Sequence, residues 1–274
     1  RSPPTTAGRM AMLAEMIAVS AERIEGNLSY ALSQENNHGI SEAMGLWSAG
    51  LVLTDHPRAG HWAELGRKVL ERAGLELIYD DGTFSQHSIN YHRLMLQDYL
   101  WAIRLGQAKN RTLSDGLLES VERAGQFLRN MLDPATGLAP NLGANDGALI
   151  LPLTDCDYRD MRPAVQAVSL LFSGQPAFPA GPWDALARWL GLEGTEGGVE
   201  GLGEEHEGAD AAYGQGGIVV LRGRTSRGII RCTSRYRHRP SHADQLHLDL
   251  WIGDENVLRD AGSFSYNCDP PWQT

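Results

Sequence analysis

The sequence predicts a multidomain protein of the α+β class, in which paired helices come first and antiparallel strands follow. Apolar residues recur at helical spacing through the first two thirds of the chain, and no strand patterns alternate with them. After a stretch rich in Gly and Glu, short β-rich runs replace the helical pattern. This order excludes the alternating strand–helix pattern of a Rossmann or TIM-barrel fold.

Five long segments of the helical part carry apolar residues on one face, and turn-forming residues such as Asp133-Pro134 follow them. Two shorter segments near the end of this part show the same spacing. We therefore expect helices over 9–32, 41–53, 60–75, 88–105, 114–132, 165–172 and 183–190.

The C-terminal part predicts strands at 217–222, 228–234, 245–251 and 257–260, with turns at 224–227 and 253–256. Polar and apolar residues alternate strictly over 245–251, as in a half-buried strand. We assign 1–192 to a helical domain, 193–212 to a Gly/Glu-rich linker and 213–274 to an antiparallel sheet domain. We expect that sheet domain to be truncated, because a small sheet with open edges is marginally stable.

Charge and composition narrow the classes of partner. The formal net charge of −10 argues against nucleic acid, which needs a basic field. Seven arginines and no acidic residue lie between 211 and 243, so the charge is segregated; these arginines either face an acidic ligand or line the solvent face of a sheet. The sequence predicts no membrane span and shows no signal peptide. Three scattered cysteines without a CxxC pair favour free thiols.

The first polar cluster, 36–42, opens a predicted helix. Asn37 or Ser41 is a candidate cap, and His38 would lie near the positive end of the helix dipole, where a histidine tends to stay neutral and able to accept a proton. Glu42 lies in the same segment. The alternative is a plain capping segment.

The second cluster is a turn that runs into a helix, 81–93, and it is dense in hydrogen-bonding side chains. Tyr91 and His87 are four residues apart and share a face; alternatively, Tyr91 is an amphipathic core residue. Two later polar loops, 140–147 and 157–162, are candidates to line a groove or merely to turn the chain. The candidate side chains are Gln86, His87, Asn90, Tyr91, Arg93, Asn145, Asp146 and Arg162.

The fourth cluster, 236–247, holds His238, His242 and His247 beside Arg239 and Asp244. Several histidines near a strand start suggest either a metal site or the edge of an active site, and their spacing does not select a metal.

In this order the four clusters resemble the heparinase II/III-like polysaccharide lyases, which include heparin, alginate and oligo-alginate lyases. The resemblance implies an incomplete (α/α) toroid followed by an antiparallel β-sandwich, and a periplasmic or secreted location. It implies no cofactor for the chemistry, but a structural zinc bound by His242, Asp260 and a later histidine. The matching pieces are Asn37-His38 with Glu42, 81–84 with Tyr91, and 241–246 with 250–251 and 260–262.

The resemblance further implies β-elimination on an acidic, uronate-containing polysaccharide or oligosaccharide. Asn37 and His38 would neutralise the uronate carboxylate, and Tyr91 would act as acid, and as base for one sugar epimer. The family's catalytic strand histidine falls here on Pro240, so His238 or His242 would serve as the other base. The substrate-binding candidates are Glu42, Gln86, His87, Asn90, Arg93, Asn145, Asp146, Arg162 and Arg239.

Two other classes of function stay open on the sequence. One is a glycoside hydrolase on an α/α toroid, with Asp146 and Glu42 as opposed carboxylates. The other is a non-catalytic glycan-binding protein that has kept the groove and lost the base.

Overall fold

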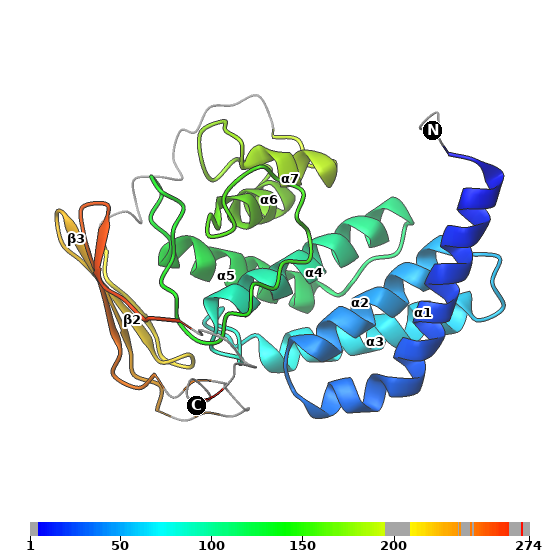
Figure 1. Cartoon of the computed structure of the whole chain (residues 1–274), viewed down its shortest axis with the longest axis horizontal. Helices are drawn as coiled ribbons and strands as arrows, with labels where there is room; N and C mark the ends of the chain where they lie inside the picture. The colour runs from blue at the N-terminus through cyan, green and yellow to red at the C-terminus, as the bar shows by residue number, and fades with distance from the viewer. Residues whose placement is uncertain are drawn as a thin grey trace.

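The computed structural model describes residues 5–194, 209–234, 236, 242, 244–262 and 270. Within these ranges a helical region precedes a five-stranded antiparallel sheet, as the sequence predicts (Figure 1). The helices are α1 Ala7–Ser33, α2 Asn37–Val52, α3 Ala59–Leu77, α4 Ile89–Ala108, α5 Asp115–Met131, α6 Arg162–Ser173 and α7 Asp184–Trp189. The strands are β1 Ala211–Tyr213, β2 Ile218–Arg222, β3 Ser226–Arg231, β4 Leu248–Ile252 and β5 Glu255–Leu258.

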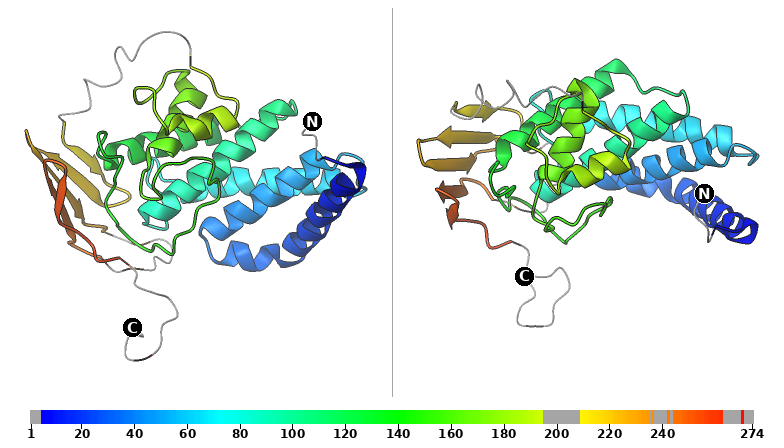
Figure 2. Two further views of the ribbon diagram at one scale, coloured as in Figure 1. Left: turned by 45° about the horizontal axis from the view of Figure 1, so that its top comes forward. Right: turned by 90° about the horizontal axis from the view of Figure 1, so that it is seen from above.

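The sheet stands across one end of the helical region, and α1 lies at the other end (Figures 1 and 2). Contacts between the two regions are specific. The carboxylate of Asp81 accepts the backbone N–H groups of Gln215 (2.7 Å) and Gly216 (3.1 Å). On the other side of the interface, Asn130 donates to the Tyr213 hydroxyl at 2.8 Å. None of the described helices is long and apolar enough to cross a membrane.

Helices α2 and α3 pack with their backbones in near contact, which two glycines permit. A Cβ at Gly50 would lie 2.4 Å from the Ala63 nitrogen, and one at Gly66 would lie 2.5 Å from the Trp47 nitrogen. Any larger residue at either position would push the helices apart.

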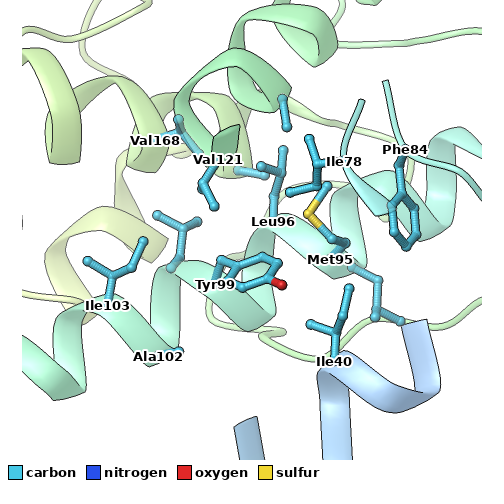
Figure 3. Close-up of a cluster of buried hydrophobic side chains, with 14 of the residues drawn as sticks. Ile40, Ile78, Phe84, Met95, Leu96, Tyr99, Ala102, Ile103, Val121 and Val168 are labelled. Atoms are coloured by element: carbon cyan, nitrogen blue, oxygen red, sulfur yellow. The ribbon is translucent and has the colours of Figure 1, made fainter. Parts of the chain in front are cut away.

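The core is built around α4, whose side chains are buried on nearly every side (Figure 3). Met95, Leu96 and Tyr99 are fully buried, and residues of α2, α5 and α6 pack against this helix. Some buried α4 side chains are polar, and each has a partner. The His92 ring donates to the Ala124 carbonyl oxygen at 2.8 Å, and burial lowers the pKa of His92 to about 4, so that this histidine is neutral.

The five strands pair in chain order, β1-β2-β3-β4-β5, each antiparallel to the next. The alternation expected over 245–251 is wrong in two respects. The strand begins only at Leu248, and its buried residues are Asp249 and Trp251, whereas Leu248 is 39% exposed. Asp249 tolerates burial because its Oδ1 accepts hydrogen bonds from Trp251 Nε1 (2.5 Å) and Asn256 Nδ2 (2.7 Å).

Other predicted boundaries also differ from the structure. Helix α2 starts four residues before the expected 41, since Asn36 accepts the His38 N–H at 3.0 Å and is the cap in place of Asn37 or Ser41. Strand β3 starts at Ser226, inside the expected turn 224–227. Strand β1 lies across the end of the expected linker, most of which is outside the described residues.

The close approach of α2 and α3 gives a stability prediction. Gly66→Ala should lower the free energy of unfolding by about 1–3 kcal/mol, because the new methyl group meets backbone atoms of Trp47 and Ala43. Urea denaturation measures the loss. Gly60→Ala is the matched control in the same helix: it has nothing within 4 Å and should not destabilise the protein. Equal destabilisation by both variants would contradict this packing.

Candidate functional site

The start of α2 is bonded to the turn that precedes α4. The Asn37 N–H donates to Gln86 Oε1 at 3.2 Å, and both side chains are buried. Asn37 Oδ1 is also buried and has no hydrogen-bond partner among the described residues. A buried amide oxygen without a donor is costly, so it marks a place where a ligand can supply one.

Beside Asn37, His38 is exposed and Glu42 is half-buried. Burial raises the pKa of Glu42, and the charge of His38 opposes that shift. Glu42 Oε2 has no hydrogen-bond partner within the described part of the chain. Ser41, which was a candidate cap, instead donates its hydroxyl to Asp98 Oδ2 at 2.7 Å and so ties α2 to α4.

Tyr91 lies in the first turn of α4 and is fixed at both ends. Ser88 caps the helix: its Oγ accepts the Tyr91 N–H at 3.1 Å and donates to the Ala144 carbonyl at 2.6 Å. The Tyr91 hydroxyl donates to Asp146 Oδ2 at 2.7 Å. The tyrosine and the loop 140–147 are therefore joined by a side-chain contact and by the capping serine.

A second polar group surrounds Tyr158. Its hydroxyl lies 2.6 Å from Asn90 Oδ1 and 2.7 Å from Asn145 Oδ1. The guanidinium of Arg93 stacks on the Tyr158 ring at 4.4 Å, donates to the Tyr158 carbonyl, and donates to Asn90 Oδ1 at 2.7 Å. Burial lowers the pKa of Arg93 and raises that of Tyr158. Arg93 is thus committed to this network.

Loop 140–147 also reaches the sheet region. The Gly143 N–H donates to Asp244 Oδ2 at 3.2 Å, and Asp244 forms an ion pair with the fully buried Arg231 at 2.5 Å. Gly143 has φ +74°, and a Cβ there would lie 2.1 Å from the His87 carbonyl oxygen, so the position requires glycine. His242 Nδ1 lies 3.7 Å from Asp244 Oδ1. The strand-side histidine is therefore linked to the loop that holds Tyr91.

His87 itself is buried with φ +52°, a backbone conformation that residues other than glycine rarely adopt. Its ring meets Tyr79 edge-on at 6.2 Å and Tyr236 at 5.1 Å. Such strained residues cluster at functional sites, where surrounding contacts hold them in place.

A hollow of about 700 Å³ lies beside Asn90 and Tyr158, between the loops of the helical region and strands β4 and β5. Its walls are polar and apolar in about equal parts, and they bring together predicted residues and residues that the sequence did not single out. The lining includes Asn90, Asn145, Tyr158, Arg159, Trp251, Asn256, Arg259 and Asp260.

Several predicted residues are not part of these contacts or of the hollow. Arg162 is held by Asp160 at 2.8 Å, stacks on Trp183 at 3.9 Å and donates to the Ala135 carbonyl, which is a structural arrangement. His238 and Arg239 lie outside the described residues. Tyr158 and the Arg231–Asp244 pair were missed; the density of polar residues in 157–162 was the available signal for Tyr158.

The described part of the chain contains no set of ligands for the zinc ion that the family resemblance implies. No three His, Cys, Asp or Glu side chains there are grouped so that they would hold a metal ion. Asp260 Oδ1 accepts the Gly262 N–H at 2.6 Å, and the His242 ring faces Asp244. Cys156 and Cys232 are free thiols.

Comparison with known proteins gives a family and a fold. The family model described as "Heparinase II/III N-terminus" matches residues 3–149, more than half of the chain. No curated protein matches the sequence. Among solved structures, heparinase III matches with a TM-score of 0.64 and 20% identity over 88% of this chain and 37% of that chain.

A second solved structure, heparan sulfate lyase HepC from Pedobacter heparinus, matches with a TM-score of 0.59 and 18% identity over 90% of this chain. At this identity the likeness shows the fold. The chain spans 36% of that enzyme's length and 37% of heparinase III.

The contact between Ser41 and Asp98 gives a pH prediction. Burial raises the pKa of Asp98 from 3.8 to about 7, so the folded protein keeps a proton that the unfolded chain releases at lower pH. The wild type should therefore lose stability relative to Asp98→Asn as the pH rises from about 4 to about 7, by a few kcal/mol, with no further change above that window. Denaturation curves measured across this range would contradict the assignment if the two proteins ran parallel.

Proposed function

The chain belongs to the heparinase II/III family, a family of polysaccharide lyases, and on this premise we propose that it cleaves a uronic-acid-containing polysaccharide by β-elimination. The observation that carries the proposal is the linkage of four separate sequence clusters into one contact network. Asn37 is bonded to Gln86, Tyr91 to Asp146, and His242 is linked to the same loop through Asp244 and Gly143.

The elimination has three chemical requirements. The uronate carboxylate must be neutralised so that the proton on C5 becomes acidic, a base must remove that proton, and an acid must protonate O4 as the C4–O4 bond breaks. The C5–H electron pair forms the C4–C5 double bond, and the C4–O4 pair leaves with O4. No external oxidant or reductant is needed.

Asn37 fits the first requirement. Its amide is buried at the start of a helix, where the dipole favours negative charge, and its Oδ1 lacks a donor within the described residues. A carboxyl group that shares a proton with this amide would supply the missing donor, while the amide N–H₂ and the neighbouring His38 stabilise the developing enolate charge.

Tyr91 is suited to act as the acid that protonates O4. A carboxylate 2.7 Å from the hydroxyl repels a phenolate and therefore favours the protonated phenol, which is the form that can donate to O4. In this structure the single proton of the hydroxyl is donated to Asp146, so the O–H group has to turn from Asp146 to O4 for the transfer, and Ser88 fixes the backbone from which it projects. In this assignment His242, held against Asp244, is the base that removes the C5 proton.

A glycoside hydrolase would need Asp146 and Glu42 as a pair of carboxylates that are free to react. Both oxygens of Asp146 are engaged: Oδ2 accepts the Tyr91 hydroxyl, and Oδ1 accepts the Ala148 N–H at 3.1 Å. This commitment favours elimination over hydrolysis.

Tyr91→Phe should lower the rate of elimination by at least about a hundredfold, because the proton donor to O4 is lost. The ultraviolet absorbance of the unsaturated product, measured with alginate, heparan sulfate, hyaluronan and glucuronan, reports that rate. Tyr30→Phe, at a tyrosine of α1 that is 68% exposed, is the matched control and should leave the rate unchanged. Full activity in Tyr91→Phe would overturn the assignment of the acid, and no product from any uronate polymer would overturn the function.

Asp146→Asn separates the lyase from the hydrolase. An amide oxygen still accepts the Tyr91 hydroxyl but carries no charge, so we expect the turnover number to fall by only about tenfold. Steady-state kinetics on a polymer that the wild type degrades measure the effect. Complete loss of turnover, with the fold intact by circular dichroism, would indicate that the carboxylate itself takes part in the chemistry.

A further inference from the structure

A second hollow, of about 650 Å³, lies on the helix-facing side of the sheet, at the tip of the β2–β3 hairpin. It is separate from the residues that surround Tyr91, and the segments that follow α5 and precede α7 form its opposite wall. Four arginines line it: Arg129, Arg222, Arg224 and Arg227.

The strand register concentrates this charge. Arg222 and Arg227 are directly opposite each other across β2 and β3, and Arg227 is opposite Trp251 of β4. Like charges at directly opposite positions of a sheet are destabilising unless a counter-charge lies between them. At the other end of β3 such a counter-charge exists, because Asp244 neutralises Arg231. Within the described residues, Arg222 and Arg227 form no ion pair.

The side chain of Arg227 has hydrogen-bond donors that an anion could occupy. Its Nε and Nη2 atoms are buried and have no hydrogen-bond partner in the described part of the chain. Its guanidinium lies 5.2 Å from the centroid of the Trp251 ring, which orients it. Burial lowers the pKa of Arg227, the nearby charges of Asp133 and Asp249 oppose that shift, and the charge of Arg222 adds to it.

The charges of Asp133 and Asp249 act on Arg227 from nearby, but neither carboxylate forms an ion pair with it within the described residues. Asp133 lines the hollow, but its Oδ1 accepts two hydrogen bonds from Thr136 at 2.8 Å. Asp249 is fully buried, its pKa is raised by that burial, and its Oδ1 is taken by Trp251 and Asn256. Asp210 accepts the backbone N–H of Arg222 at 2.8 Å.

Trp251 lines both hollows, so the two hollows adjoin at this residue. We propose that the hairpin arginines bind an anionic group, a sulfate or a carboxylate, on a sugar residue distant from the cleaved bond. This inference rests on the proposed function for its ligand, an acidic saccharide chain.

Isothermal titration calorimetry of the full chain tests the site. The background variant is Tyr91→Phe, which should slow cleavage at least about a hundredfold, and the probes are a sulfated uronate hexasaccharide and its desulfated counterpart. Adding Arg227→Gln should raise the Kd of at least one probe by about tenfold or more, because charge-assisted hydrogen bonds are lost. A change with the sulfated probe alone identifies sulfate, and an equal change with both identifies carboxylate.

Arg72→Gln is the matched control. It removes the same charge from an arginine of α3 whose side chain is 61% exposed and pairs with Glu76, and it should leave both Kd values within about twofold. Arg224→Gln, at an exposed hairpin position, should weaken binding in the same direction and carries the test if Arg227→Gln does not fold.

A natively folded Arg227→Gln protein that binds both probes as tightly as the background variant would overturn the inference, as would the absence of binding by the background variant. The proposed function is judged separately, by the elimination rate of the wild type. Normal elimination with Arg227-independent binding leaves the function standing and removes this site. Binding that depends on Arg227, without elimination, leaves this site standing and removes the proposed function.

Discussion

The hydrogen bond from Gly143 to Asp244 is the contact on which the candidate site depends. Through it the loop 140–147 is fixed against the sheet region, and the same loop holds the capping Ser88 and the Tyr91 hydroxyl on the other side. Gly143 permits this arrangement because any side chain would collide with the His87 carbonyl. The positions of the tyrosine and of the strand-side histidine are thus set by one short polar loop rather than by direct contact between them.

The helical core makes this loop geometry possible. Helix α4 is buried on nearly all sides, so its first turn is a rigid platform for Tyr91, and its polar side chains anchor neighbouring segments. Gln97 Oε1 accepts the N–H groups of Ile150 and Leu151 at 3.2 Å and so fixes the chain just after loop 140–147. Packing, hydrogen bonding and the candidate chemistry therefore meet at one end of one helix, beside a sheet whose inner face adds Trp251 and the hairpin arginines.

The order of helices and strands was predictable because each helix carries its own periodic apolar face, which is local information. The polar density and order of the sequence select the candidate residues, but not their partners, because those depend on contacts between distant segments. The pairing of Asp146 with Tyr91 spans 55 residues, and that of Gly143 with Asp244 spans 101. The same limit explains the errors. Asn36 and Asn37 are equally good caps in sequence, Asp249 is buried because Asn256 reaches it, and Arg162 is held by Asp160 and Trp183.

Elimination, hydrolysis and simple binding leave different products, so the products distinguish the three functions. Mass spectrometry of the oligosaccharides released from a uronate polymer gives the answer in one experiment. We expect fragments whose new non-reducing ends are each lighter by one water than the corresponding hydrolysis products, because elimination forms a C4–C5 double bond and adds no water. Fragments with the full mass of hydrolysis products, or an unchanged polymer that stays bound to the protein, would contradict the proposed elimination.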